Sequence, residues 1–233
     1  MQSRRALIFA NGDQINIEAV RAMILPGDYR VAADGGLRHL RRLDLQPDLV
    51  IGDLDSISPA DIDQLRQDQV RIEQYPVHKD ETDLELALAA ALRAGCDSVL
   101  ILAALGGRLD MTLANIFLLT LPELANRDVR LEDGLEEVFL IRPNSGENGQ
   151  GCPITGQPGD RVSLLPLNGP ATGIHTSGLY YPLRGETLYP ERTRGVSNRM
   201  TGTSARVLLA SGLLICIHTR EVSPDYGSNE EKS

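Results

Sequence analysis

The sequence predicts an α/β protein: an N-terminal doubly wound parallel sheet domain followed by a C-terminal all-β, sandwich-like domain. Up to about residue 142, short apolar runs alternate with helix-type patterns, as in parallel sheets covered on both faces. Beyond residue 151 come short β-type runs separated by Gly and Pro, without a helical period. We therefore divide the chain into residues 1–142, a polar, glycine-rich linker at 143–151, residues 152–220, and a polar tail at 221–233 that we expect to be flexible.

Each element of the first domain follows from a local signal. The buried strands are expected at residues 7–10, 30–33, 49–51, 70–75, 98–102 and 129–131. The helices are expected at residues 17–24, 37–43, 59 onward, 83 to about 95, and 111–121. Ser58 and Pro59 mark a helix start, and Thr82 with Glu85 has the spacing of a capping box. In the second domain we expect strands at 161–165, 173–176, 205–209 and 213–218.

Composition excludes several function classes. The formal net charge of -9 argues against broad binding to nucleic acid or to anionic membranes, which requires a basic face. The three cysteines form no CxxC pair, so neither a zinc site nor a disulfide framework is indicated. The apolar run at residues 6–10 is too short for a signal peptide or a membrane span. We expect a soluble, cytoplasmic protein.

Acidic turns follow four successive strands of the first domain. These turns are Asp34-Gly35-Gly36, Gly52-Asp53-Leu54-Asp55-Ser56, Lys79-Asp80-Glu81-Thr82-Asp83 and Gly106-Gly107-Arg108-Leu109-Asp110. In an open parallel sheet all strand-to-helix turns lie along the carboxyl edge, where ligands bind. We therefore expect these carboxylates to meet in one crevice, although they are distant in the sequence.

A group of aspartates repels itself unless a cation holds it, and Mg²⁺ prefers oxygen ligands together with substrate phosphates. The glycines allow the backbone to approach a bulky anion, and the helix starts offer free N–H groups. Lys79 and Arg108 add positive charge at the same edge. Any single aspartate is also a common helix cap, so only the coincidence of four acidic turns predicts a Mg²⁺–polyphosphate site.

Taken in order, these four strings resemble the motif set of the thiamine pyrophosphokinase family. Asn115 beyond the fourth string and the later Gly195-Val196-Ser197-Asn198 extend the similarity, which spans about residues 7 to 218. The resemblance implies transfer of a pyrophosphoryl group from ATP to thiamine, with AMP and thiamine diphosphate as products. It also implies a homodimer, a nucleotide-binding catalytic domain at 1–142, and a thiamine-binding, dimerising β-sandwich at 152–220.

The resemblance further implies roles for single residues. Asp53, Asp55, Asp83 and Asp110 would surround Mg²⁺ and the polyphosphate as catalytic and metal-binding residues, with Asp34, Gly35 and Gly36 nearby. Lys79, Thr82, Arg108 and Asn115 would contact phosphate or substrate, and Ser197 and Asn198 would hold thiamine. Met111 and Arg199 depart from frequent residues of the family. The chain has no Trp, so Tyr180 or Tyr181 would have to supply any aromatic wall.

For the mechanism we expect in-line attack of the thiamine hydroxyl on the β-phosphorus of ATP, catalysed by positioning and charge neutralisation. Asp55 or Asp83 would accept the hydroxyl proton, and replacing either by Asn should lower turnover by roughly 10²-fold. The rival hypotheses are another Mg²⁺-dependent phosphotransferase or phosphohydrolase, or a nucleotide-binding regulatory module without turnover. The chain has no GxxxxGK[ST] loop, and the turn after the first strand reads Asn11-Gly12-Asp13.

Overall fold

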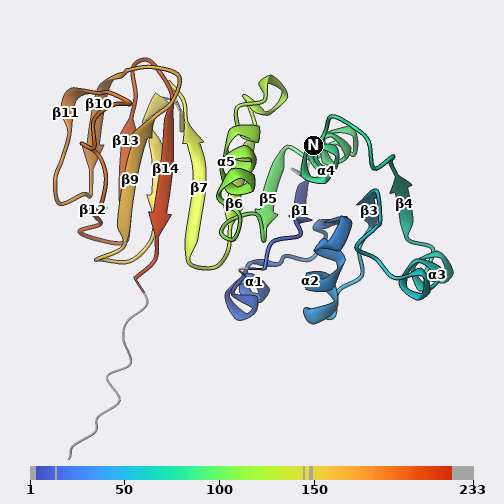
Figure 1. Cartoon of the computed structure of the whole chain (residues 1–233). Coiled ribbons are helices and arrows are strands. Elements are labelled where there is room, and N and C mark those ends of the chain that lie inside the picture. Colours follow the sequence, from blue (N-terminus) through green and yellow to red (C-terminus); the bar gives the residue numbers. More distant parts are fainter. Residues whose placement is uncertain (1–3, 14, 144, 147–148, 222–233) are drawn as a thin grey trace, which may run out of the picture.

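The computed structural model describes residues 4–13, 15–143, 145–146 and 149–221. Within them the strands form two sheets (Figure 1). The larger sheet has ten strands in the order β12-β9-β14-β7-β6-β5-β1-β2-β3-β4, and the smaller has four in the order β11-β10-β13-β8. The α/β fold with a C-terminal β-sandwich is thus confirmed.

One half of the larger sheet is parallel. Its strands are β1 (Arg5–Phe9), β2 (Tyr29–Ala33), β3 (Leu49–Gly52), β4 (Arg71–Gln74), β5 (Ser98–Leu102) and β6 (Asp128–Glu132). From β1 the chain adds strands on one side as far as β4 and then returns to place β5 on the other side of β1. The sheet therefore has a switch point between β1 and β5, where α/β proteins bind ligands.

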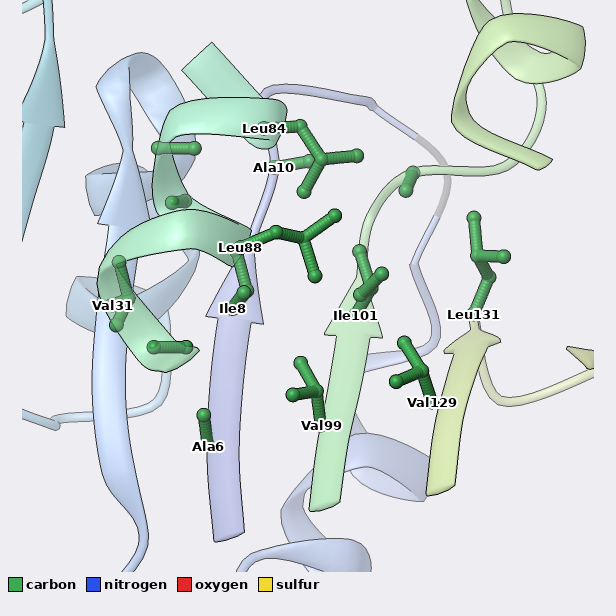
Figure 2. Packing of buried hydrophobic residues seen from close by; sticks show 14 of the residues in the cluster. Ala6, Ile8, Ala10, Val31, Leu84, Leu88, Val99, Ile101, Val129 and Leu131 are labelled. Atoms are coloured by element: carbon green, nitrogen blue, oxygen red, sulfur yellow. The ribbon is translucent and has the colours of Figure 1, made fainter. Parts of the chain in front are cut away.

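Helices cover both faces of this half. They are α1 (Ile17–Met23), α2 (Leu37–Arg42), α3 (Pro59–Gln67), α4 (Asp83–Arg93) and α5 (Leu109–Leu118), with the short 3₁₀ helices η1 (Asp34–Gly36) and η2 (Pro122–Leu124). On one face, Leu84 and Leu88 of α4 pack against Ile8 and Ile101 of the central strands (Figure 2). Residues of α1, α2 and α3 pack on the opposite face around Phe9.

The predicted caps start the helices as expected. The Ser58 hydroxyl accepts a hydrogen bond from the Asp61 N–H, and the Thr82 hydroxyl accepts one from the Glu85 N–H, both at 3.2 Å. These bonds satisfy amides that would otherwise have no partner in the first turn. They fix the start of α4 immediately after the acidic turn that follows β4.

The larger sheet continues beyond residue 142. β7 (Glu136–Ile141) pairs antiparallel with β6 and with β14 (Leu214–Thr219), which pairs with β9 (Arg161–Pro166), and β12 (Asn198–Arg199) forms the edge. Facing these strands is the small sheet of β8 (Cys152–Thr155), β10 (Ala171–Ser177), β11 (Arg184–Leu188) and β13 (Ser204–Leu208). A separate core, including Phe139, Val162 and Val207, lies in this β part.

One sheet of the sandwich is therefore an extension of the parallel sheet. The strands β7, β8, β11 and β12 are additional to those expected from the sequence, partly because Glu136 and Glu137 interrupt the apolar pattern of β7. The division at 142, 151 and 220 remains a prediction. Residues 144, 147 and 148 of the expected linker and 222–233 of the expected tail lie outside the described residues. In the described chain, no helix combines the length and the apolar character that crossing a bilayer demands.

Candidate functional site

A cleft of about 800 Å³ opens at the carboxyl edge of the parallel strands, at the switch point. We call it the main cleft. The turns after β1, β2, β3, β4 and β5 all line it, as predicted from the positions of the acidic turns. Its lining includes Asn11, Gly12, Asp13, Asp34, Asp53, Lys79, Thr82, Asp83, Gly106, Gly107, Arg108 and Asn115.

Three carboxylates meet in this cleft: Asp34, Asp53 and Asp83, which we call the acidic triad. Each offers an oxygen, and these oxygens lie within 4.8 Å of one another. Asp34 is only 5% exposed and has a φ of 44°, an uncommon backbone conformation for a non-glycine residue. The side chains come from three different turns, so the fold, and not the local sequence, brings them together.

Gly52, at the end of β3, makes room for the triad. Its φ is +146°, and a Cβ there would lie 3.0 Å from Asp34 Cβ and 3.1 Å from Asp83 Oδ1. Any larger residue would push these two carboxyl groups apart. Only glycine combines this backbone angle with so close an approach.

Lys79 is the cation that contacts the acidic triad. Its Nζ lies 2.9 Å from Asp83 Oδ1 and 3.7 Å from Asp53 Oδ2. Burial lowers the pKa of Lys79, but Asp83 and Asp53 raise it more, so the amine stays charged. Burial raises the pKa of Asp83, and Asp53 and Asp34 add to this, whereas Lys79 opposes it. One ammonium group therefore faces three carboxylates.

Two oxygens of the triad have no hydrogen bond. Asp34 Oδ1 and Asp83 Oδ1 are buried without a partner of hydrogen-bonding geometry among the described residues, although Asp83 Oδ1 is ion-paired with Lys79. Leaving buried carboxylate oxygens unpaired is unfavourable. Hard oxygen donors in this arrangement fit a divalent cation such as Mg²⁺.

The opposite wall of the main cleft is the start of α5. Gly106 and Gly107 have φ values of 75° and 69°, which lead the chain into the helix. Arg108 Nη2 lies 2.5 Å from Asp110 Oδ2, and this contact lowers the pKa of the Asp110 carboxyl. Asn115 is buried and donates from Nδ2 to the Ala104 carbonyl at 2.8 Å, so its amide also holds the strand end.

Asp55 and Asp110 lie outside the acidic triad. Leu54 has a φ of 67° and is buried, and Asp55 after it is exposed and accepts a hydrogen bond from the Ser56 hydroxyl at 3.1 Å. Asp110 is exposed and paired with Arg108. The triad therefore contains Asp34 in addition to Asp53 and Asp83, and differs in membership from the four carboxylates expected from the sequence.

The two predicted glycines after Asp34 lie too close to the end of β1 and the turn after it to carry a side chain. A Cβ at Gly36 would lie 1.9 Å from the Phe9 carbonyl oxygen, and one at Gly35 would lie 2.3 Å from the Asn11 side chain. Gly35 lines a smaller neighbouring groove of about 270 Å³. Both glycines allow η1 to approach the turn after β1.

Ser197 and Asn198 lie in the β part, at the start of the edge strand β12. β12 and β1 are six strand positions apart in the sheet, which is roughly 29 Å at the usual strand spacing. Asn198 Nδ2 donates to the Tyr181 carbonyl at 2.7 Å, and its Oδ1 accepts from the Tyr181 N–H at 3.0 Å. These bonds hold a turn on which Tyr180 and Tyr181 are 66% and 67% exposed, with their rings edge to face.

The sequence-based site did not include residues 11–13. The structure places all three in the lining of the main cleft, directly after β1. Their position offered a signal, since the turn after the first strand commonly contacts the ligand in doubly wound sheets. Like the turns after β2 and β5, this one contains a single carboxylate, Asp13.

Comparison with known proteins agrees with the geometry. The family models described as "Thiamin pyrophosphokinase, catalytic domain" and "Thiamin pyrophosphokinase, vitamin B1 binding domain" match residues 21–131 and 152–214. The thiamine pyrophosphokinase of Bacillus subtilis is 27% identical over 192 residues, covering 82% of this chain and 87% of that protein.

Solved structures show the same fold. A thiamine pyrophosphokinase from Bacillus subtilis has a TM-score of 0.82 at 24% identity, covering 94% of this chain and 100% of the other. A thiamin pyrophosphokinase family protein from Enterococcus faecalis has a TM-score of 0.76 at 27% identity, with the same coverage. With its two parts matched in order by the two domain models, the chain belongs to the thiamin pyrophosphokinase family.

Proposed function

We propose that this enzyme transfers the pyrophosphoryl group of ATP to the hydroxyl of thiamine, releasing AMP and thiamine diphosphate, and that it requires Mg²⁺. The observation that carries the proposal is the acidic triad beside Lys79 in a cleft at the switch point of a parallel sheet. Membership of the family names the substrates that such a site would take.

The acidic triad fits the metal. Its oxygens converge, two of them are buried without a hydrogen bond, and Gly52 leaves the space between the side chains free. We therefore assign Asp34, Asp53 and Asp83 as the residues that would hold Mg²⁺. When bound, Mg²⁺ would neutralise charge on the polyphosphate and fix its orientation. The assignment of Asp55 and Asp110 as metal ligands remains a prediction from the sequence alone.

The protein's own groups position the substrates. Lys79 lies beside the triad and would balance negative charge on the transferring group. The start of α5 presents Arg108, which would exchange Asp110 for a phosphate oxygen, and the backbone N–H groups of its first turn. Between the two proton acceptors predicted from the sequence, the site favours Asp83, because Asp83 lines the cleft.

Thiamine binding requires a second copy of the chain in this proposal. Within one chain, roughly 29 Å of sheet separates β12 from β1, which is too far for Ser197 and the triad to hold one small molecule. We infer a homodimer in which Ser197 of the partner subunit approaches the main cleft. Asn198 then acts by shaping the Tyr180–Tyr181 turn, because its amide is already hydrogen-bonded there. We also infer a cytoplasmic location, which the three free, buried cysteines favour.

The test is to incubate the protein with ATP, Mg²⁺ and thiamine and to identify both products by chromatography and mass spectrometry. We expect AMP and thiamine diphosphate in equal amounts. Release of ADP or inorganic phosphate would indicate a different phosphotransferase or a phosphohydrolase. Nucleotide binding without thiamine-dependent AMP release would indicate a regulatory module instead.

A further inference from the structure

The turn after β1 packs tightly against the end of β5. The Gly12 N–H donates to the Ala103 carbonyl at 2.9 Å, and a Cβ at Gly12 would lie 2.3 Å from that oxygen. Residues 11–13 all line the main cleft. On this side the turn has no room to move, so its exact position depends on what holds its other side.

Helix α2 holds the other side. Arg38 Nη2 donates to the carbonyls of Asn11 at 2.8 Å and Gly12 at 2.9 Å, and to Asp13 Oδ1 at 2.7 Å. His39 Nε2 lies 2.8 Å from the same Gly12 carbonyl oxygen. The Arg38 side chain is 44% exposed, whereas His39 is 1% exposed. His39 is therefore the buried residue that holds the turn by a hydrogen bond, and Arg38 is the partly exposed one.

The hydrogen bonding fixes the form of the His39 ring. Because a carbonyl can only accept, the short contact with Gly12 at 2.8 Å places a proton on Nε2, and it outweighs the longer contact of 3.4 Å from Arg38 Nε, which would need a lone pair there. Nδ1 is buried without a partner among the described residues, so a proton there would have no acceptor. Burial lowers the pKa of His39, and Arg38 and Arg42 add to this, while the Gly12 carbonyl and Asp13 oppose it. The ring is thus neutral. An apolar side chain of similar size would fill the same space but would lack the hydrogen bond to the Gly12 carbonyl.

This fastening determines which backbone group of the turn is left without a partner. The peptide between Gly12 and Asp13 is trans, so its C=O and N–H point in opposite directions. With the C=O held toward α2, the Asp13 N–H is turned away from α2, and no acceptor for it is present in the part of the chain that the structure describes. Arg38 also neutralises the Asp13 carboxylate, which would otherwise repel an anionic ligand.

We propose that His39 and Arg38 are positioning residues for the nucleotide. They hold residues 11–13 so that the Asp13 N–H is available to a phosphate of ATP, and they set the affinity for ATP without touching it. The inference rests on the proposed function, which supplies ATP as the ligand of the main cleft. A free backbone N–H at a switch point is a common donor to phosphate oxygens.

The test compares four variants of the full chain: His39→Leu, His39→Gln, Arg38→Met and Leu43→Ala. Gln can place an amide N–H near the position of Nε2, so it serves as the rescue. Leu43 is buried at the end of the same helix and packs in the core, so Leu43→Ala controls for lost stability alone. The readouts are KM for ATP and for thiamine, kcat, and the Kd of a non-hydrolysable ATP analogue measured by calorimetry on folded protein.

We expect His39→Leu to raise KM for ATP and the Kd of the analogue by about tenfold, the equivalent of one hydrogen bond, with kcat and KM for thiamine unchanged. His39→Gln should recover most of the affinity, and Arg38→Met should lose less than His39→Leu because Arg38 is more exposed. Wild-type affinity in His39→Leu, equal losses in Leu and Gln variants, or an equal loss in Leu43→Ala would overturn the inference.

The design covers a variant that does not fold, and it separates failure of this inference from failure of the proposed function. If His39→Leu does not fold, Arg38→Met and His39→Gln still decide the question, and wild-type Kd in Arg38→Met would then overturn it. If the wild-type chain binds the analogue but forms no AMP with thiamine, the proposed function fails while the effect of His39 on Kd still tests the positioning role.

Discussion

Two clusters of ionisable side chains lie on the same sheet and differ in how their charges are balanced. The acidic triad in the main cleft has three carboxylates, one lysine and two oxygens without hydrogen bonds. The second cluster, which we call the histidine network, consists of Glu137, Asp160 and His218 in the antiparallel half. His218 is fully buried, with Nε2 3.0 Å from Asp160 Oδ2 and Nδ1 3.5 Å from Glu137 Oε2.

The histidine network has further partners that balance its charge, although His218 Nδ1 makes no hydrogen bond among the described residues. Arg130 donates to Glu137 Oε1 at 2.9 Å, and the backbone N–H groups of Gln157 and Glu221 donate to Asp160 at 2.8 and 3.0 Å. A Cβ at Gly156 would lie 2.5 Å from Asp160 Oδ2, so the pair is also tightly covered. Balanced charges of this kind stabilise the fold, whereas the unbalanced triad is suited to a ligand. The comparison teaches that a buried cluster marks a functional site where its carboxylates outnumber the cations beside them.

The largest expected effect is at the triad. Asp83→Asn should lower turnover by roughly 10²-fold or more, about 2.7 kcal/mol of barrier, because it removes a carboxylate assigned to the metal. Its melting temperature should not fall, because the substitution removes one of three carboxylates that repel one another. Asp63→Asn, at an exposed ion pair on α3, is the control. A loss in Asp55→Asn as large as in Asp83→Asn would mean that the turn after β3 rearranges when substrate binds.

The next effect is steric. Gly52→Ala places a Cβ 3.0 Å from Asp34 Cβ at a φ that L-residues rarely adopt, so the triad must open. We expect turnover to fall by about 10- to 100-fold, as for small displacements of catalytic groups. Gly202→Ala is the matched control, because nothing lies within 4 Å of a Cβ there and its φ is not positive. Unchanged steady-state kinetics in Gly52→Ala would contradict the role given to this glycine.

The histidine network should respond in stability and not in turnover. Asp160→Ala leaves His218 buried without its nearest carboxylate, and we expect roughly 3 kcal/mol less stability toward chemical denaturation. The kcat of the folded variant should match that of the wild type. A large loss of kcat with little loss of stability would reverse the assignment of the two clusters.

The network also predicts a pH dependence. Burial raises the pKa of Glu137, but His218 and Arg130 lower it more, from 4.5 to about 2, so its stabilisation is present above pH 4.5 and lost as pH falls toward 2. Burial lowers the pKa of His218, but Glu137 and Asp160 raise it above 6.5, so its stabilisation is complete below pH 6.5 and declines at higher pH. Thermal unfolding of His218→Gln against wild type should differ most between pH 4.5 and 6.5. A difference that grows above pH 8 would contradict these signs.

The smallest effect separates capping from binding. Thr82→Ala and Ser58→Ala each remove an N-cap bond of 3.2 Å, and each should cost about 1 kcal/mol of unfolding free energy. Only Thr82 lines the main cleft, so only Thr82→Ala should also raise KM for ATP. Equal kinetics in the two variants would reduce Thr82 to a helix cap.

Local signals in the sequence predicted what depends on neighbours along the chain. Ser58 and Thr82 cap their helices as predicted, because a cap involves residues three positions apart. The gathering of acidic turns at one edge could also be predicted, because it follows from strand order in a doubly wound sheet. What could not be predicted was which side chain of a turn points inward. Asp53 and Asp55 are two residues apart, and the backbone angle at Leu54 separates their directions.

Long-range pairing was harder to predict. β12 has only two residues and exists because β9 lies beside it, and β7 carries two glutamates whose partners come from β6 and β14. No local pattern contains that information. The same holds for Arg38 and His39, whose importance depends on the turn after β1 lying against α2.

The place of β14 in the sheet has a consequence for biosynthesis. β14 ends at Thr219 and lies between β7 and β9, so it pairs with one hydrogen-bonding edge of each strand. While the chain is still leaving the ribosome, β7 and β9 each have an open hydrogen-bonding edge that no earlier segment fills. Open edges of apolar strands are where nascent chains aggregate. We expect the emergence of β14, and not completion of the first half, to be the moment at which the newly made protein is protected from aggregation through these edges.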